Sequence, residues 1–236
     1  MSHSLVCLSG LLVAFLLFSC QTVKPEADFG PAKVGDAQLM KVLLARGQDP
    51  DARDQNGNTA LIMAAMFGWT EVADLLLARQ ADINARNNLG FTALTTAAIN
   101  NQRGFVNYLL ARGADIDNRD FPGSNSALLA AISFGYVEIV DDLLRAGADA
   151  NANYDDGYTP LIMAARNDKP VILQRLLDHK ARINQASYNG HTALSVACDY
   201  QQTGNIKLLL ENGANPDLAD SRGKTPLIIA ISQDKL

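Results

Sequence analysis

Few residues of this sequence could carry out chemistry, and they are scattered along the chain. Cys198, His179 and His191 belong to the residue types that serve as nucleophiles, bases or metal ligands. Their spacing fits no metal site, and no Ser-His-Asp order, phosphate loop or dinucleotide-binding motif occurs in a suitable context. A reactive thiol needs an activating group beside it, and the local sequence offers Cys198 none. We therefore expect a buried, inert Cys198, no catalytic residue, no bound metal and no cofactor.

One acidic segment resembles part of a calcium-binding loop. Residues 151–157 combine Asn and Asp with a final Gly157, as such loops do. The glycine comes one place late, however, and Ile162 stands where the loop would need a bidentate glutamate. Asn, Asp and Gly are also the residues that turns prefer. We therefore interpret this segment as a turn.

The same turn begins a unit that occurs six times in the chain. Each unit has a turn with a glycine, then a Thr or Ser, then a Leu two residues later. The six hydroxyl residues follow one another at intervals of 33, 34, 33, 33 and 33 residues, and they are Thr59, Thr92, Ser126, Thr159, Thr192 and Thr225. A fixed period of this length is the sequence signature of a solenoid.

Each unit predicts two short helices. The hydroxyl residue is placed to cap the first helix, where its side chain accepts a backbone N–H. The Leu two residues later and an Ala five residues later lie on one face of that helix. The second helix carries a Leu pair, followed three residues later by Gly113, Gly147 or Gly213 as a C-terminal stop. Gln80 and Lys180 take this place in the other two copies, where we expect some backbone strain.

A turn, two antiparallel helices and an Ala-Asp-x-Asn exit at this period resemble the ankyrin repeat. The resemblance covers residues 36–236 and implies an all-α ankyrin-repeat solenoid, with helix-turn-helix repeats joined by β-hairpin-like turns. In this family a His usually follows the Leu of the first helix. Here its place is taken by Ile62, Thr95, Leu129, Ile162, Ser195 and Ile228. We therefore expect the hydrogen bonds of that His to be absent, with apolar contacts replacing them in at least four copies.

The chain divides into four parts. Residues 1–19 indicate a signal peptide, because residues 5–18 are almost wholly apolar but too short to span a membrane comfortably. Residues 20–35 are expected to be a tether, with room for a broken first helix of a capping repeat. Residues 36–53 match the second helix of a repeat and are expected to form an N-terminal capping half repeat. Residues 54–236 then hold five full repeats and a partial last one.

The end of the leader resembles the lipobox of bacterial lipoproteins. Leu17, Phe18 and Ser19 precede Cys20, which in that family receives the lipid and becomes the new N-terminus. Gln21 at the next position implies sorting to the outer membrane. The resemblance implies an exported protein of the bacterial periplasm whose only membrane contact is the lipid on Cys20. An uncleaved leader that acts as an anchor is the alternative.

The last copy ends shortly after its first helix. Leu227, Ile228, Ile229 and Ile231 would then face neither a second helix nor a further repeat. Terminal repeats normally have a polar outer face. We therefore expect either self-association through this C-terminal repeat or a different packing of its helix.

The charge pattern argues against nucleic acid as a partner. The chain has 20 Lys and Arg against 25 Asp and Glu, a formal net charge of −5, whereas phosphate backbones need clustered cations. Only the fourth copy is locally basic, through Arg166, Lys169, Arg175, Lys180 and Arg182. A solvated face explains these cations, and contact with anionic lipid headgroups is the alternative.

Aromatic residues gather where ankyrin proteins bind partners, at the turn tips and the exposed ends of first helices. The candidate partner-binding residues are Phe67, Phe91, Phe121, Phe134, Tyr154, Tyr158, Tyr188 and Tyr200, with Asp155 and Asp156 as a negative turn tip. A contiguous row of exposed aromatic side chains would be typical of a protein-binding surface. In the alternative, Phe67, Phe134 and Tyr200 pack between helices while the tip rings stack on one another.

These observations lead us to expect a non-enzymatic protein–protein interaction module of the bacterial cell envelope. The resemblance to exported bacterial ankyrin-repeat proteins implies a role in stress protection, or as an immunity or inhibitor protein that neutralises a secreted effector. A cytoplasmic or host-directed ankyrin effector is a further alternative, which the apolar leader disfavours. A hydrolase on a repeat scaffold would need a clustered nucleophile and base, which the sequence does not provide.

Overall fold

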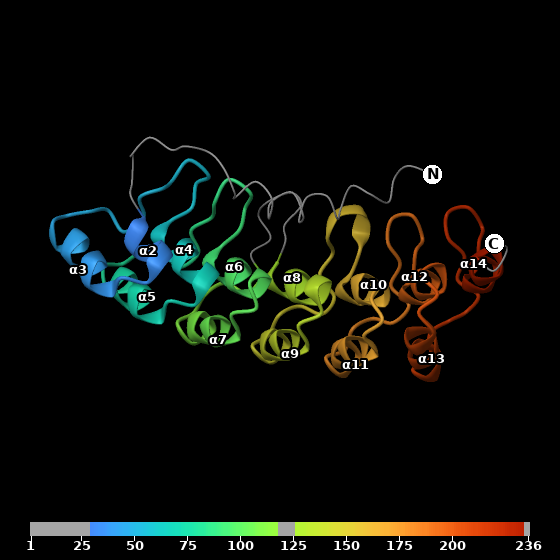
Figure 1. Ribbon diagram of the computed structural model, residues 1–236. Helices are drawn as coiled ribbons and strands as arrows, with labels where there is room; N and C mark the ends of the chain where they lie inside the picture. The colour runs from blue at the N-terminus through green and yellow to red at the C-terminus, as the bar shows by residue number, and fades with distance from the viewer. Residues whose placement is uncertain (1–28, 118–125, 234–236) are drawn as a thin grey trace.

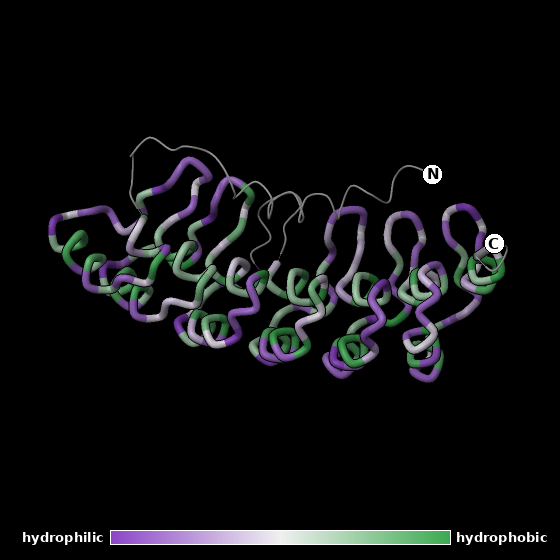
Figure 2. Tube along the Cα trace, in the orientation of Figure 1, coloured by the Kyte–Doolittle hydropathy of each residue, from purple (hydrophilic) through white to green (hydrophobic). Residues whose placement is uncertain are grey.

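The computed structural model describes residues 29–117 and 126–233, and all regular structure within these ranges is helical. The helices form two rows in an elongated array, and the connecting loops project from one side of the inner row (Figure 1). Figure 2 shows that the loop tips are mainly hydrophilic, whereas hydrophobic residues follow the inner helices. The expected all-α solenoid of helix-turn-helix repeats is therefore confirmed.

The inner row consists of the first helix of each copy and the outer row of the second. The inner helices are α2 (Gly30–Val34), α4 (Ala60–Phe67), α6 (Ala93–Ile99), α8 (Ala127–Phe134), α10 (Pro160–Ala165), α12 (Ala193–Asp199) and α14 (Pro226–Gln233). The outer helices are α3 (Ala37–Ala45), α5 (Thr70–Leu77), α7 (Arg103–Ala111), α9 (Val137–Arg145), α11 (Pro170–Asp178) and α13 (Thr203–Glu211). Successive inner helices pack against one another from α2 to α14, and each outer helix packs against the inner helix of its own copy. Most successive outer helices also pack together.

Local hydrogen bonds explain why the inner helices start where they do. The hydroxyl of Thr59 accepts the backbone N–H of Ile62 at 3.3 Å, and Thr159 does the same for Ile162 at 3.2 Å. The other four caps act alike, and they are Thr92, Ser126, Thr192 and Thr225. Each cap satisfies an N–H that has no partner inside its helix. The capping role inferred from the repeated hydroxyl is therefore confirmed.

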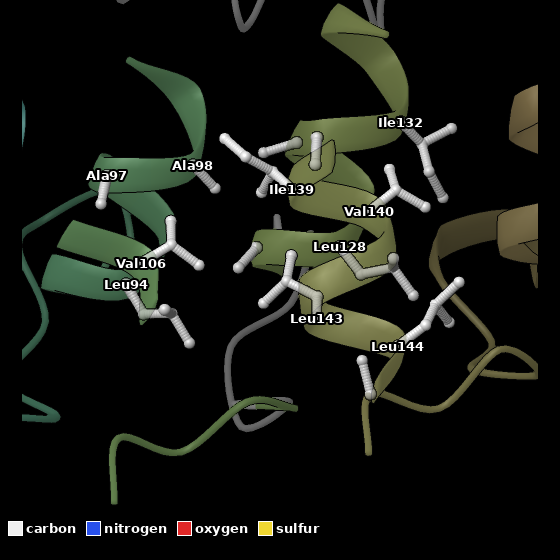
Figure 3. Packing of buried hydrophobic residues seen from close by; sticks show 14 of the residues in the cluster. Leu94, Ala97, Ala98, Val106, Leu128, Ile132, Ile139, Val140, Leu143 and Leu144 are labelled. Atoms are coloured by element: carbon white, nitrogen blue, oxygen red, sulfur yellow. The ribbon is translucent and has the colours of Figure 1, made fainter. Parts of the chain in front are cut away.

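The core of the array is formed by the repeated Leu and Ala of the inner helices with the apolar face of the outer helices. Leu94 and Leu128 are each 1 % exposed, and Ala97 and Ala131 are fully buried. Figure 3 shows buried apolar side chains of α6, α7, α8 and α9, with some of them between the two helix pairs and others on the far side of α8 and α9. Alanine at this position leaves room for neighbouring inner helices to approach closely, which a larger side chain would prevent.

Two kinds of interaction replace those of the His that the family usually has after the Leu of the inner helix. Ile62 and Ile162 are each 1 % exposed and supply apolar contacts, as expected. Ser195 is equally buried, but its hydroxyl accepts the N–H of Thr192 at 3.0 Å and completes a capping box. Apolar replacement in at least four copies is wrong, because Leu129 is only half-buried and Ile228 is 47 % exposed.

The Ala-Asp-x-Asn exit joins each copy to the next one. The side chain of Asn84 accepts the backbone N–H of Asp115 at 2.9 Å, and that of Asn151 accepts the N–H of Arg182 at 2.7 Å. The same bond joins three further pairs, which are Asp51 to Asp82, Asp117 to Asp149 and Asn184 to Asn215. Five bonds of this kind therefore link the six copies from α2 and α3 to α12 and α13, which fixes the step between these repeats.

The outer helices end in left-handed backbone, as the glycine pattern predicts. Gly113 and Gly213 have φ values of 81° and 86°, where glycine meets no steric penalty. Gln80 and Lys180 adopt the same conformation with φ values of 62° and 64°. The expected strain at these two residues is confirmed, because a side chain in this region crowds its own backbone.

The N-terminal boundary differs from the expected one. Helix α2 lies within the stretch expected to be a tether, and Phe29 and Ala32 are buried at 2 % and 0 % exposure. Pro31 lies in the first turn of this helix, and Gly35 ends it with φ 75°, beside the indole ring of Trp69. The first copy therefore has a short first helix in the place that the sequence left for one, and the capping unit begins before residue 36. The remainder of the expected tether lies outside the described residues.

The last inner helix, α14, has one buried and one exposed side. Ile229 is 7 % exposed because it faces the packed side of α14 toward α12. Leu227, Ile228 and Ile231 are 65 %, 47 % and 54 % exposed. The expectation that all four residues lack a covering neighbour is therefore wrong for Ile229, and self-association through the other three stays a prediction.

Candidate protein-binding surface

Three aromatic side chains stand at the C-terminal ends of alternate inner helices. Phe67, Phe134 and Tyr200 are 43 %, 37 % and 39 % exposed. They occupy one repeat position, which Asn100 and Asn167 hold in the intervening copies. We call these five residues the helix-end row. The alternative that its rings pack between the helices is wrong, because more than a third of each ring residue remains accessible.

Two rings of the helix-end row are extended by a second aromatic residue. Phe67 stacks with Trp69 at a centroid distance of 6.4 Å, and Phe134 stacks with Tyr136 at 5.6 Å. Trp69 is itself 39 % exposed, and it enlarges the accessible apolar surface of the first full copy. Sequence reasoning missed Trp69 and Tyr136. The sequence signal for these two residues was an aromatic-Gly-aromatic triplet. The glycine adopts left-handed backbone at the end of the inner helix and reverses the chain direction, which brings the two rings together.

The turn tips hold the second group of predicted aromatic residues, with mixed exposure. Tyr188 is 80 % exposed and lies against Gly157 of the preceding turn, while Phe91 and Tyr158 are half-buried. Tyr154 has a structural contact, because its hydroxyl lies 2.6 Å from that of the capping residue Ser126. Phe121 lies outside the described residues.

The predicted row is thus divided into two groups. An inner helix of eight residues such as α4 is about 12 Å long. The turn tips precede the N-terminal caps, and the helix-end row follows the C-terminal ends, so the helices separate the two groups. Asp155 and Asp156 are exposed at the turn tip of the fourth copy, on the side of Tyr188. A single contiguous row of rings is therefore wrong, and the helix-end row is the more regular part.

A shallow, open depression lies between copies three, four and five at the helix-end row. It is lined by residues that include Phe134, Arg166, Lys169 and Gln202. The guanidinium carbon of Arg166 lies 5.0 Å from the ring centroid of Tyr200, which is cation–π geometry. The Lys169 ammonium donates a hydrogen bond to the carbonyl of Gly135 at 3.0 Å. Two cations, the carboxylate of Asp168 and the accessible ring of Phe134 therefore line one hollow, and Tyr200 contacts it through Arg166.

The other cations of the fourth copy do not join this hollow. Arg175 lies on α11 in the outer row, with its Nε 3.8 Å from a carboxylate oxygen of Asp141 on α9. Lys180 and Arg182 belong to the connection after α11. The structure therefore divides the five basic residues instead of forming the single patch that contact with anionic headgroups would use.

The outer face satisfies many of its charges internally. Arg103 on α7 forms two hydrogen bonds to Asp142 on α9, at 2.6 and 3.0 Å, and they hold the pKa of this carboxyl group below its ordinary value. Tyr108 and Arg112 both contact Asp74 at 2.7 Å. Burial, followed by the hydrogen bond to Asp74, raises the pKa of Tyr108. These contacts join neighbouring outer helices.

The residues considered first as nucleophiles, bases or metal ligands are not placed for that chemistry in the described structure. Cys198 is 6 % exposed, and burial raises the pKa of its thiol, which disfavours the nucleophilic thiolate. Across residues 29–117 and 126–233, no cluster of three or more His, Cys, Asp or Glu side chains is arranged to hold a metal ion. None of the helices described has the length and apolar character needed to cross a membrane. Cys20 lies outside the described residues.

Comparisons with known proteins agree with this architecture. The sequence model of the family "Ankyrin repeats (3 copies)" matches residues 31–120, 128–220 and 172–236, so the chain belongs to the ankyrin-repeat family. The chain is similar to the crystal structure of the human ASB11 ankyrin repeat domain, with a TM-score of 0.75 and 25% sequence identity. That match covers 86% of this chain and 90% of the other. No protein with a curated description matches the chain.

The family membership sets the general class of function. Ankyrin repeats are generally protein–protein interaction modules, and their fold typically serves as a non-enzymatic scaffold. The accessible rings of the helix-end row agree with that class, because aromatic side chains are enriched among the residues that dominate binding energy at interfaces.

Proposed function

We propose that this chain is a non-enzymatic protein-binding module of the bacterial cell envelope, and that it holds its partner mainly through the helix-end row. One observation carries the proposal. The inner helices bury their repeated Leu residues almost completely in five copies, yet they keep Phe67, Phe134 and Tyr200 more than a third exposed at one position. Exposure of a large aromatic ring to water does not stabilise the fold, so its recurrence at one repeat position favours a role in binding a partner.

The first test removes the rings and leaves the fold intact. The variant Phe67→Ala/Phe134→Ala/Tyr200→Ala is expected to melt within a few degrees of the wild type, because these side chains contribute little to the core. We expect it to lose capture of the partner that the chain from Gln21 onward isolates from envelope extracts, as identified by mass spectrometry.

A matched control tests whether loss of any exposed apolar side chain has the same effect. Val171 and Leu210 on the outer helices are 51 % and 46 % exposed. The variant Val171→Ala/Leu210→Ala is expected to capture the partner normally. Equal loss of capture in both variants would refute the assignment of the surface, and unfolding of the ring variant would show that the rings support the core.

The location in the envelope is supported by the apolar leader and by the Ser-Cys sequence at its end. We propose that Cys20 carries a lipid and anchors the mature chain to the outer membrane, facing the periplasm. Labelling with a radioactive fatty acid, followed by fractionation, is expected to place label on the wild type and none on Cys20→Ser. Unlabelled wild-type protein in the cytoplasmic fraction would contradict this location.

The role within the envelope follows from the partner. Stress protection and neutralisation of a secreted effector both require only a bound protein. We propose stress protection, on the resemblance to exported bacterial ankyrin-repeat proteins. Capture of a toxic effector, with rescue of sensitive cells by co-expression of this chain, would assign the immunity role instead.

A further inference from the structure

The junction between the two helices of the fourth copy differs from the others. Helix α10 ends at Ala165 after six residues, whereas α4, α6, α8 and α12 have seven or eight. In those four copies a left-handed residue turns the chain between the helices, at Gly68, Asn101, Gly135 and Gln201. The equivalent residue Asp168 does not have a positive φ. Pro170 begins α11, and the residue before a proline prefers extended backbone, as Lys169 shows with φ −134°.

A buried polar side chain supports this irregular junction. Asn205 on α13 is 0 % exposed at a repeat position that Ile139 and Ile172 fill with apolar side chains. Its amide nitrogen donates to the carbonyls of Ala165 at 3.2 Å and Asn167 at 2.6 Å. Its side-chain oxygen is buried without a hydrogen-bond partner, which is unfavourable for stability. The side-chain amide of Asn205 is therefore kept in the core although it lowers stability. Its two hydrogen bonds hold residues 166–169 in place.

The supported junction presents two cations to the depression at the helix-end row. Arg166 lies over the ring of Tyr200, and Lys169 reaches back to the carbonyl of Gly135. Neither cation forms an ion pair with the carboxylates of the described residues. Both therefore retain hydrogen-bonding capacity for an anion that enters the hollow beside the ring of Phe134.

The one carboxylate of the junction is turned toward a helix. A side chain added at Gly204 would meet the Oδ1 atom of Asp168 at 3.6 Å, which places this carboxylate beside the first turn of α13. The N-terminal turn of a helix attracts negative charge through its free N–H groups. Asp168 therefore reduces the positive charge of the hollow without pairing directly with Arg166 or Lys169.

We infer that residues 166–169, together with Phe134 and Tyr200, form an anion-recognising subsite that binds an acidic side chain of an extended protein segment. An apolar neighbour of that acidic residue rests on the ring of Phe134, and the ring of Tyr200 holds Arg166 by cation–π contact. The inference names the chemistry of the partner at the helix-end row and so depends on the proposed function. Asn205 is the positioning residue of this subsite, because it holds the backbone that carries both cations.

A protein segment fits the hollow better than the other polyanions. Nucleic acid binds through many clustered cations, and lipid headgroups attract clusters of four to eight, whereas this hollow has two cations in a chain of net charge −5. A single carboxylate with an apolar neighbour matches two cations beside one accessible ring.

The first experiment selects peptides from a displayed library of random linear sequences on three immobilised proteins. These are the wild type, Arg166→Gln/Lys169→Gln, and the control Lys207→Gln, which removes an exposed cation of α13. We expect wild type and control to enrich peptides with Asp or Glu beside an apolar residue, and the double variant to lose that enrichment. Enrichment without acidic residues, or the same peptides on the double variant, would overturn the inference.

The second experiment measures charge selectivity by fluorescence titration. The probes are one selected peptide and its copy with each Glu or Asp replaced by the amide. We expect the wild type to bind the acidic probe about tenfold more tightly, as for one charge-assisted hydrogen bond. Arg166→Gln/Lys169→Gln should bind both probes alike. Binding by the wild type of a short RNA or of anionic vesicles alone would refute a protein segment as the occupant.

The variant Asn205→Ile separates positioning from stability. Isoleucine stands at this position in copies three and four, so the helices are expected to remain folded by circular dichroism. We expect the preference for the acidic probe to disappear while weak binding to the rings remains. An unchanged preference in this variant would show that Asn205 does not position the subsite.

Failure of this inference is distinguishable from failure of the proposed function. If Arg166→Gln/Lys169→Gln captures the envelope partner as the wild type does, while the ring variant does not, the acidic subsite is refuted and the binding module stands. If the ring variant also captures the partner, the helix-end row is not the binding surface, and both are refuted.

Discussion

The packing of the array is best tested with two Leu residues that occupy the same position of the repeat but differ in burial. Leu128 and Leu227 both lie two residues after the capping hydroxyl of an inner helix. Leu128 is 1 % exposed, between α6 and α10, while Leu227 is 65 % exposed on α14. The two substitutions Leu128→Ala and Leu227→Ala therefore remove the same atoms from two different environments.

The expected magnitudes follow from this difference in burial. A buried Leu→Ala change loses the transfer free energy of the removed carbons and leaves a cavity, which together cost about 2–5 kcal/mol. Leu128 lies in the middle of the array, so its loss weakens the packing toward copies on both sides. An exposed Leu227 has little transfer free energy to lose, and its truncation should change stability by less than about 0.5 kcal/mol.

Unfolding in guanidinium chloride, followed by circular dichroism, gives the free energies, and thermal melting gives an independent check. For a chain of this length, 1 kcal/mol shifts Tm by roughly 2–4 °C, so Leu128→Ala should lower it by about 4–20 °C. Leu227→Ala should stay within about 2 °C of the wild type. Equal destabilisation by the two variants would refute the claim that neighbouring copies, and not the motif itself, decide the energetic role of this Leu.

Three further perturbations test other parts of the array. Gln80→Gly and Lys180→Gly should each raise the free energy of unfolding by up to about 1 kcal/mol, since glycine relieves the left-handed strain; lower stability in denaturant titrations would contradict this. Asp142→Asn should lower stability at neutral pH by removing the contacts from Arg103. The pKa of Asp142 is lower in the folded state than in the unfolded state, so its contribution to the free energy of unfolding is full above about pH 4. This contribution is lost as the pH falls through the folded pKa, and the unfolding curves of variant and wild type should converge in acid. Asn84→Ala should cost about 0.5–1.5 kcal/mol in the same assay, because the N–H of Asp115 exchanges its bond to Asn84 for one to water, and an unchanged midpoint would argue against the inter-repeat link.

The candidate surface was only partly predictable from the sequence. Phe67 and Phe134 were recognised because their repeat position can be counted from the cap. Trp69 was missed because its exposure and its stacking on Phe67 depend on the left-handed turn between them. Tyr154 was counted as a binding residue, yet its hydroxyl contacts Ser126 of the preceding copy. A contact between residues 28 positions apart cannot be read from local spacing.

The sequence by itself determined the repeating unit of this protein. Capping hydroxyls, helix periodicity and left-handed stops act within a few residues, so the chain carries the information for each helix locally. The tertiary structure alone decided which copies are complete, which Leu residues are buried and where the polar Asn205 finds its carbonyl partners. The physical reason is that burial and hydrogen bonding between copies depend on what the neighbouring repeat provides, and identical motifs meet different neighbours along the array.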